Sequence, residues 1–204
     1  MGSSFSSLGS PIFKLPVLAF GVLAASADAE VVNTSIGAID GSFENGIYSY
    51  KGIPYAQPPV GALRWLPPQP VKQSDKAIAA KQYGAICLQT KRPNLASSNM
   101  SEDCLTLNVW TQSLAAEKRP VMVWIHGGAF RAGSGITAGD TFANLGAVVV
   151  SINYRLGPLG FFSHESLPDL PANPGVLDMV AALEWVQKNI ASFGGDPDNV
   201  TIFG

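Results

Sequence analysis

The sequence predicts an α/β fold with a mostly parallel central sheet and flanking helices. Two short runs, Val121–Ile125 and Ala147–Ile152, are almost continuously apolar and rich in β-favouring residues. Runs of this kind are typical of central strands that helices cover on both faces. A stretch with helical apolar spacing follows at 174–190, and Val200–Phe203 begins another buried strand.

The first 29 residues have the features of a secretory signal peptide. Lys14 precedes an apolar run, Leu15–Ala25, and small residues follow it. Cleavage after Ala27 or Ala29 would match the small-x-small pattern, which leaves 30–204 as the mature domain. The apolar run is too short for a convincing membrane span. We therefore expect a secreted or periplasmic protein without a stable membrane anchor.

Charge and cysteine content exclude some classes of function. The chain has 13 basic and 15 acidic residues, a net charge of −2 and no basic cluster, which argues against nucleic-acid binding. Its two cysteines, Cys87 and Cys104, have no histidine or second cysteine pair nearby, so we expect no zinc site and no cofactor. A secreted context favours oxidation of the two thiols, and two unrelated buried thiols are the alternative.

The run Val121–Ile125 ends abruptly in the glycine-rich sequence His126-Gly127-Gly128-Ala129. Open α/β sheets bind their ligands at the carboxyl ends of strands. Small residues there allow backbone N–H groups to approach a reacting atom, so the chemical use of such a loop is hydrogen bonding to an oxyanion. A simple tight turn is the alternative interpretation of Gly-Gly after a strand.

Several motifs occur in the order that is typical of one family, and they extend from about Ile36 to the last residue. The stretches that carry the likeness are 50–56, 101–105, 126–129, 153–155, 173–178 and 193–197. Together they resemble the type-B carboxylesterases, which include the cholinesterases. The resemblance implies the amino-terminal part of an α/β-hydrolase fold, incomplete in this chain. It also implies a carboxylic-ester hydrolase that works by serine acylation and deacylation.

The resemblance assigns catalytic roles to a few residues. The backbone N–H groups of Gly128 and Ala129 would form the oxyanion hole, with Gly127 shaping the turn and His126 bracing the loop. Gly204 matches the first glycine of the G-x-S-x-G nucleophile elbow. The serine, the acid and the histidine of the triad would follow it, so we expect the chain to be truncated there and inactive by itself.

Two further residues are interpreted as structural. Ser134 lacks the strand, elbow and helix around it that present a nucleophilic serine. His164 is interpreted as a surface histidine, because the catalytic histidine of the family lies downstream of the nucleophile.

The resemblance also implies one disulfide and two ion pairs. A disulfide would join Cys87 and Cys104, and its loop closure would stabilise the fold by roughly 3 kcal/mol. Two ion pairs would satisfy charges that flank apolar runs. The predicted pairs are Arg64 with Glu102 and Arg155 with Asp178.

The pattern predicts the boundaries of several elements. Cys104–Thr111 alternates apolar and polar residues, which predicts a strand near the sheet edge. A short helix is expected at 140–145, capped by Asp140 and closed at Gly146. Asn173 and Pro174 should begin a helix that extends to about 190. Its core-facing stripe would comprise Val176, Leu177, Val180, Leu183, Val186 and Ile190.

The expected partner is a small-molecule carboxylic ester. Leu88–Asp103 contains no aromatic residue, whereas cholinesterases use a tryptophan in the corresponding loop to hold choline, so choline esters are not the expected substrates. A non-catalytic, cholinesterase-like adhesion or binding domain is the alternative function, although an intact oxyanion loop argues against it. A separately folded fragment acting as a binding module is the third possibility. Acyl and alcohol specificity and the oligomeric state stay open.

Overall fold

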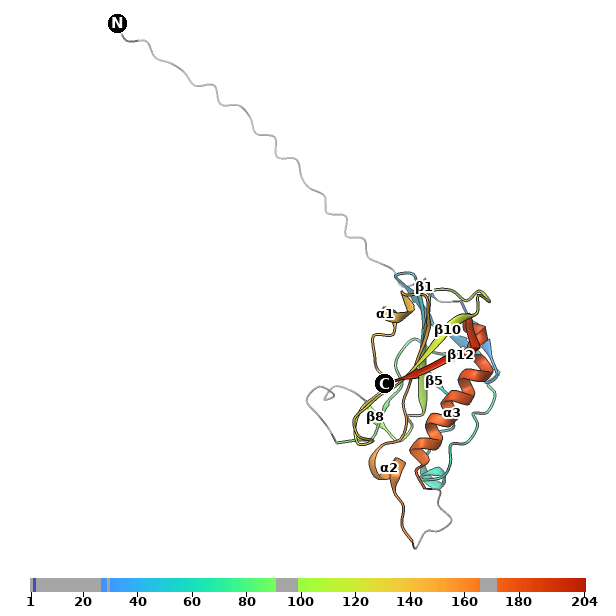
Figure 1. Ribbon diagram of the computed structural model, residues 1–204, viewed down its shortest axis with the longest axis vertical. Helices are drawn as coiled ribbons and strands as arrows, with labels where there is room; N and C mark the ends of the chain where they lie inside the picture. The colour runs from blue at the N-terminus through green and yellow to red at the C-terminus, as the bar shows by residue number, and fades with distance from the viewer. Residues whose placement is uncertain (1, 3–26, 29, 91–98, 166–171) are drawn as a thin grey trace.

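The computed structural model describes residues 2, 27–28, 30–90, 99–165 and 172–204 (Figure 1). Most of the predicted signal peptide lies outside the described residues, as does 91–98 in the stretch without aromatic side chains. Within the described ranges, no helix is both long and apolar enough to cross a membrane.

A seven-stranded sheet forms the centre of the fold, in the order β1-β4-β5-β9-β11-β10-β12. Its strands are β1 (Ala27–Asp28), β4 (Ser42–Glu44), β5 (Ile47–Pro54), β9 (Thr106–Thr111), β10 (Arg119–Ile125), β11 (Val148–Ile152) and β12 (Gly195–Phe203). The smaller sheets comprise β2 (Val32–Thr34), β3 (Gly37–Asp40) and β6 (Ile78–Ala79), and β7 (Ile86–Cys87) with β8 (Met100–Ser101).

The described part of the central sheet is mixed, which corrects the prediction of mostly parallel pairing. Only β10 pairs in parallel, with β11 and with β12, whereas β1, β4, β5, β9 and β11 follow one another antiparallel. Parallel pairing needs a long crossover, and antiparallel strands can be joined by a two-residue hairpin. Asn45-Gly46 forms such a turn between β4 and β5, with both residues at positive φ.

Strand β9 lies inside the sheet between β5 and β11, so the prediction of a position near the edge was wrong. The alternation in its sequence arises because β9 faces two apolar clusters. Leu107 and Val109 belong to the larger core cluster, while Trp110 packs on the opposite face with Ile47 and Val149. Alternation therefore does not distinguish a strand with one solvated face from a strand between two cores.

Helices cover both faces of the sheet (Figure 1). Helix α3 (Pro174–Asn189) continues into a 3-10 turn, Ile190–Phe193, and packs on the larger cluster. Helix α1 (Asp140–Ala143) packs on the other face through Ala143. Elsewhere in the described residues, the helices are α2 (Gly157–Phe161) and a 3-10 turn at Gly61–Leu63.

At the start of both predicted helices, the capping differs from the prediction. Asp140 is the first residue of α1 and Gly139 is its N-cap, so Asp140 does not cap it from outside. Asn173 precedes α3 in a left-handed conformation and makes no side-chain cap hydrogen bond. Helix α3 nevertheless begins and ends within a residue of the prediction.

The apolar stripe predicted for the core-facing side of α3 is confirmed in part: Val186 and Ile190 are fully buried and Leu183 packs against the core. Val176 and Val180 are 43% and 47% exposed, whereas the buried face carries Asp178, Trp185 and Asn189. Hydrophobic spacing alone missed the polar residues on the buried side. Asp178 and Asn189 are buried because their side chains have hydrogen-bond partners within the protein.

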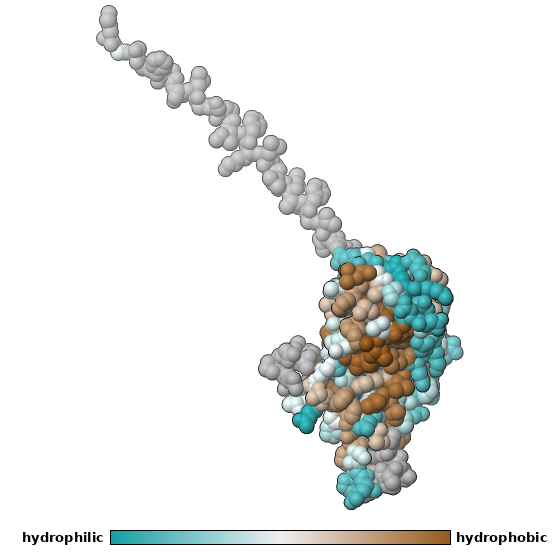
Figure 2. Space-filling model, viewed as in Figure 1, coloured by the Kyte–Doolittle hydropathy of each residue, from teal (hydrophilic) through white to brown (hydrophobic). Residues whose placement is uncertain are grey.

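The exposed stripe continues onto β12, where Ile202 is 54% exposed. Val180, Leu183, Val200 and Ile202 form the apolar part of a groove of about 440 Å³. Figure 2 shows brown, apolar surface gathered in this region, over α3 and the end of the chain. We refer to it as the α3–β12 groove.

We expect the α3–β12 groove to bind a hydrophobic dye such as ANS, because it exposes contiguous apolar side chains. Val180→Lys and Ile202→Lys should each reduce the fluorescence gain, measured by dye titration of the purified chain. Val31, which is 49% exposed outside the groove, provides the matched control Val31→Lys. Equal losses from the groove and control variants would contradict this prediction.

Candidate active site

The glycine-rich loop begins where β10 ends, at the carboxyl end of the central parallel strands. Gly128, Ala129 and Phe130 have φ of 117°, 53° and 58°, and the Gly128 carbonyl accepts hydrogen bonds from Arg131 N and Ala132 N. In the part of the chain that the structure describes, the N–H groups of Gly128 and Ala129 have no hydrogen-bond partner, and both residues are exposed. These donors are therefore free to bind a ligand.

Two glycines are required for this loop shape. A Cβ on Gly128 would collide with the Ala132 carbonyl oxygen, and a Cβ on Gly133 would collide with the His126 ring. Both have positive φ, which L side chains rarely adopt. Gly127 has open space where a Cβ would lie, so the shape of the loop does not require a glycine at this position for lack of space.

His126 braces the loop from below. It is 4% exposed and stacks on Tyr154, with 4.4 Å between ring centroids and 13° between planes. The Tyr154 hydroxyl donates to the His126 carbonyl at 2.8 Å, and His126 Nδ1 lies 3.0 Å from the Gly127 carbonyl oxygen. Burial lowers the pKa of His126 below 6.5, which the contact with Gly127 partly opposes. The ring is therefore neutral and holds the loop.

The far end of the loop rests on buried polar side chains that the sequence analysis missed. Asn153 Oδ1 accepts from Gly135 N at 2.7 Å, and Ser151 Oγ donates to the Gly135 carbonyl at 2.6 Å. Asn108 donates to both Gly135 O and Ser151 Oγ. Asn108 and Ser151 each interrupt an apolar strand, a signal that could have indicated a buried hydrogen-bond network.

The end of β12 lies directly against the start of the loop. Phe203 is in register with Trp124 on β10, and a Cβ on Gly204 would collide with the Ile125 carbonyl oxygen. Gly204 therefore lies beside Ile125, the residue before His126.

Both predicted ion pairs are present. Arg155 is buried with Asp178, with Nε–Oδ2 and Nη2–Oδ1 distances of 2.8 and 2.7 Å, and Arg155 N also donates to Oδ2. Burial raises the pKa of Asp178, and the hydrogen bonds and charge of Arg155 oppose that rise. Arg64 makes a two-point contact with Glu102 at 2.5 and 2.7 Å, which raises the pKa of Arg64. This pair is partly exposed, so it contributes little to stability.

Cys87 and Cys104 form a disulfide, with an S–S distance of 2.07 Å. Ser134 is 8% exposed, and its hydroxyl accepts from Ile136 N in a local turn, so it is not presented as a nucleophile. His164 lies beside Phe162 in an exposed segment. Among the described residues, no group of three or more His, Cys, Asp or Glu could hold a metal ion.

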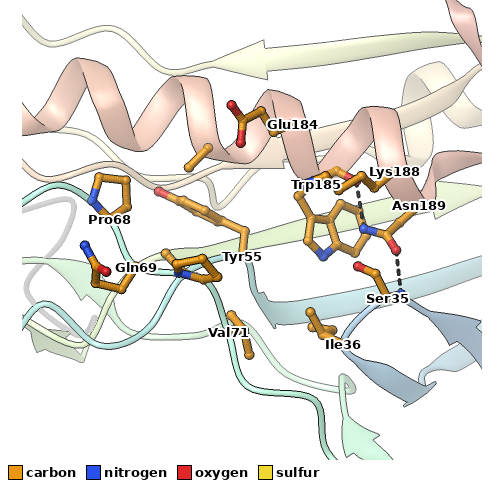
Figure 3. Close-up of a pocket in the computed structure, with 13 residues that line it drawn as sticks. Ser35, Ile36, Tyr55, Pro68, Gln69, Val71, Glu184, Trp185, Lys188 and Asn189 are labelled. Carbon is orange, nitrogen blue, oxygen red and sulfur yellow. Dashed lines mark hydrogen bonds between the residues drawn. The ribbon is translucent and has the colours of Figure 1, made fainter.

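A separate pocket of about 240 Å³ lies between α3 and the segment Pro68–Val71 (Figure 3). Tyr55, Val71 and Trp185 form part of its wall, and Asn189 links α3 to Ser35 N at 2.8 Å. Glu184 and Lys188 also line this pocket, and no histidine or cysteine does. The oxyanion-type donors of the loop have no counterpart in it, and we therefore place the candidate active site at the loop.

A model of the carboxylesterase family matches residues 28–204. The chain belongs to the carboxylesterase family. The matched residues include the loop, both ion pairs, the disulfide and Gly204, so the whole site described above lies within the family match.

Several well-characterised carboxylesterases resemble the chain. The para-nitrobenzyl esterase of Bacillus subtilis (strain 168) is 46% identical over 184 residues, which are 86% of this chain and 38% of that protein. The fumonisin B1 esterase of Sphingopyxis macrogoltabida is 41% identical over 204 residues, 94% of this chain and 38% of that protein. The crystal structure of a Geobacillus stearothermophilus carboxylesterase aligns with a TM-score of 0.79 at 45% identity, covering 85% and 37% of the two chains.

The chain therefore has the fold of part of an α/β-hydrolase carboxylesterase, and it spans less than two fifths of the length of these relatives.

Loss of one member of the Arg155–Asp178 pair should be strongly destabilising. Arg155→Met leaves a buried carboxylate without its partner, and we expect the free energy of unfolding to fall by about 3–5 kcal/mol. The double variant Arg155→Met/Asp178→Leu should recover much of this loss, because neither charge remains. Urea denaturation of the three chains measures both effects. A single variant that loses under about 1 kcal/mol would contradict the assignment.

Stability should depend on pH through His126. Because its pKa in the folded chain is below 6.5, the unfolded state binds a proton more readily, and the stabilisation present above about pH 6.5 declines as the pH falls. His126→Phe retains an aromatic ring against Tyr154 and removes the titration. We expect it to flatten the change in unfolding free energy between pH 7.5 and 5.5, measured by urea denaturation. An unchanged slope would refute this role.

Proposed function

We propose that this chain supplies the oxyanion-stabilising part of a serine carboxylic-ester hydrolase. The observation that carries the proposal is the pair of unpartnered, exposed N–H groups on Gly128 and Ala129 at the carboxyl end of β10. The surrounding contacts to His126, Gly133 and Gly135 hold the loop in a shape that leaves these donors unused. Membership of the carboxylesterase family supports ester hydrolysis as the reaction.

The chemical role follows from where charge develops during acyl transfer. Attack on an ester carbonyl places negative charge on its oxygen, and preorganised N–H donors stabilise that oxyanion more than the uncharged carbonyl. Gly128 and Ala129 would donate to it side by side. Loss of one such donor typically lowers kcat by about 10²- to 10³-fold.

The acylating serine, its histidine and its acid are proposed to be absent from this chain. Ser134 has its hydroxyl in a local turn, and His126 is neutral and occupied within the loop. Gly204, which lies beside Ile125, would then be the first glycine of the nucleophile elbow. The 204-residue chain by itself should therefore show no esterase turnover above buffer.

The substrate class is a small carboxylic ester, consistent with relatives named para-nitrobenzyl esterase, fumonisin B1 esterase and phenmedipham hydrolase. We also propose export from the cytoplasm. The apolar run Leu15–Ala25 and the disulfide between Cys87 and Cys104 support this location.

The proposal is testable in a chimera in which residues 28–204 replace the matched segment of the Bacillus subtilis para-nitrobenzyl esterase. We expect the chimera to hydrolyse p-nitrophenyl acetate. Gly128→Ala should lower kcat by about 10²- to 10³-fold, because its Cβ collides with Ala132 O and displaces the donors. Ala129→Gly keeps the N–H group and tolerates the same φ, so it is the matched control and should retain activity.

A cooperative thermal melt would show that the chimera is assembled. An assembled chimera without turnover would overturn the proposal and favour a non-catalytic, cholinesterase-like binding domain. Turnover by the 204-residue chain alone would overturn the assignment of the triad to residues outside it.

A further inference from the structure

The centre of the glycine-rich loop is held by a side chain from a distant part of the sequence. Gln89 Nε2 donates to the Gly133 carbonyl at 2.7 Å, and Gly133 N donates to Gln89 Oε1 at 2.8 Å. The amide therefore pairs with both polar groups of one residue, 44 positions away. Apart from this pairing, no hydrogen bond involves the N–H or carbonyl group of Gly133 within the described residues.

Gly133 in turn lies against the oxyanion-forming end of the loop. A Cβ at this position would collide with His126 Nδ1 and would come within 2.6 Å of the Gly127 carbonyl oxygen. A shift of Gly133 towards these atoms must therefore move His126 or Gly127, which directly precede the donors. Gly133 has a φ of 133°, a conformation that the Gln89 contacts help to hold.

Gln89 is itself attached to the disulfide region. Its Nε2 also donates to the Cys87 carbonyl at 3.0 Å, and Cys87 is bonded to Cys104. Ile86 and Cys87 form β7, which pairs with β8. The side chain thus extends from a cross-linked segment, so its amide is held in place before any substrate binds.

We propose that Gln89 is the positioning residue of the oxyanion hole, holding Gly133 so that the Gly128 and Ala129 donors keep their orientation. This inference rests on the proposed function of the loop. Gln89 touches no reacting atom and acts through Gly133 and His126. It connects the Cys87–Cys104 disulfide to the catalytic donors by a continuous chain of contacts.

Replacement of Gln89 should affect the transition state more than substrate binding. Displacement of catalytic groups by about 1 Å can cost about 10²-fold in rate, so Gln89→Ala should lower kcat in the chimera by about 10- to 100-fold. KM should change less than about threefold, because oxyanion contacts form chiefly in the transition state.

Gln89→Glu distinguishes positioning from simple filling of space. Glutamate has nearly the same shape, but its carboxylate cannot donate to Gly133 O or Cys87 O. We expect kcat of Gln89→Glu to fall by about as much as kcat of Gln89→Ala. The matched control is Gln69→Ala, which removes a glutamine whose Nε2 donates to Pro67 O at 2.9 Å in the pocket of Figure 3, away from the loop. It should leave kcat unchanged.

A second readout does not require catalysis. Hydrogen exchange at the Gly133 amide, followed by mass spectrometry in the full 204-residue chain, should become at least tenfold faster in Gln89→Ala and change little in Gln69→Ala. Wild-type kcat in Gln89→Glu, or unchanged exchange in Gln89→Ala, would overturn the positioning role. If the chimera itself were inactive while exchange responded as expected, the proposed function would fail and the Gln89–Gly133 contact would stand.

Discussion

The buried ion pair between Arg155 and Asp178 is the contact on which the rest of the structure depends. It connects the segment that follows β11 to α3, with both side chains almost fully excluded from solvent. A buried charge without its partner is far more costly than an exposed one. The pair therefore determines how α3 lies on the sheet, and it requires a polar residue on the helix face that enters the core.

The same segment of the chain also supports the glycine-rich loop. Asn153 binds Gly135, Tyr154 stacks on His126 and donates to its carbonyl, and Arg155 binds Asp178. Three consecutive residues thus hold both ends of the loop and the amino-terminal half of α3. A displacement of Arg155 would consequently displace its neighbours Asn153 and Tyr154, which hold the loop.

Polar groups inside this site are preorganised by hydrogen bonds within the protein. Gln89, Asn108 and Ser151 contact loop carbonyl or N–H groups, and these contacts fix the backbone at positive φ values near Gly128 and Gly133. Donors held in advance do not have to reorganise when charge develops on the substrate. The neutral state of His126 fits this arrangement, since an imidazolium beneath the loop would be poorly solvated.

Local features of the sequence determined the buried strands at Val121–Ile125 and Ala147–Ile152, the helix after Pro174, and the glycine-rich loop, because each depends on neighbouring residues. The pairing of Arg155 with Asp178 came from family resemblance. Only the tertiary structure decided that β9 is interior and that Val180 is exposed, since periodicity shows that a face is apolar but not what covers it. The contact of Gln89 with Gly133 also required the fold, because it joins residues 44 positions apart whose types carry no pairing signal.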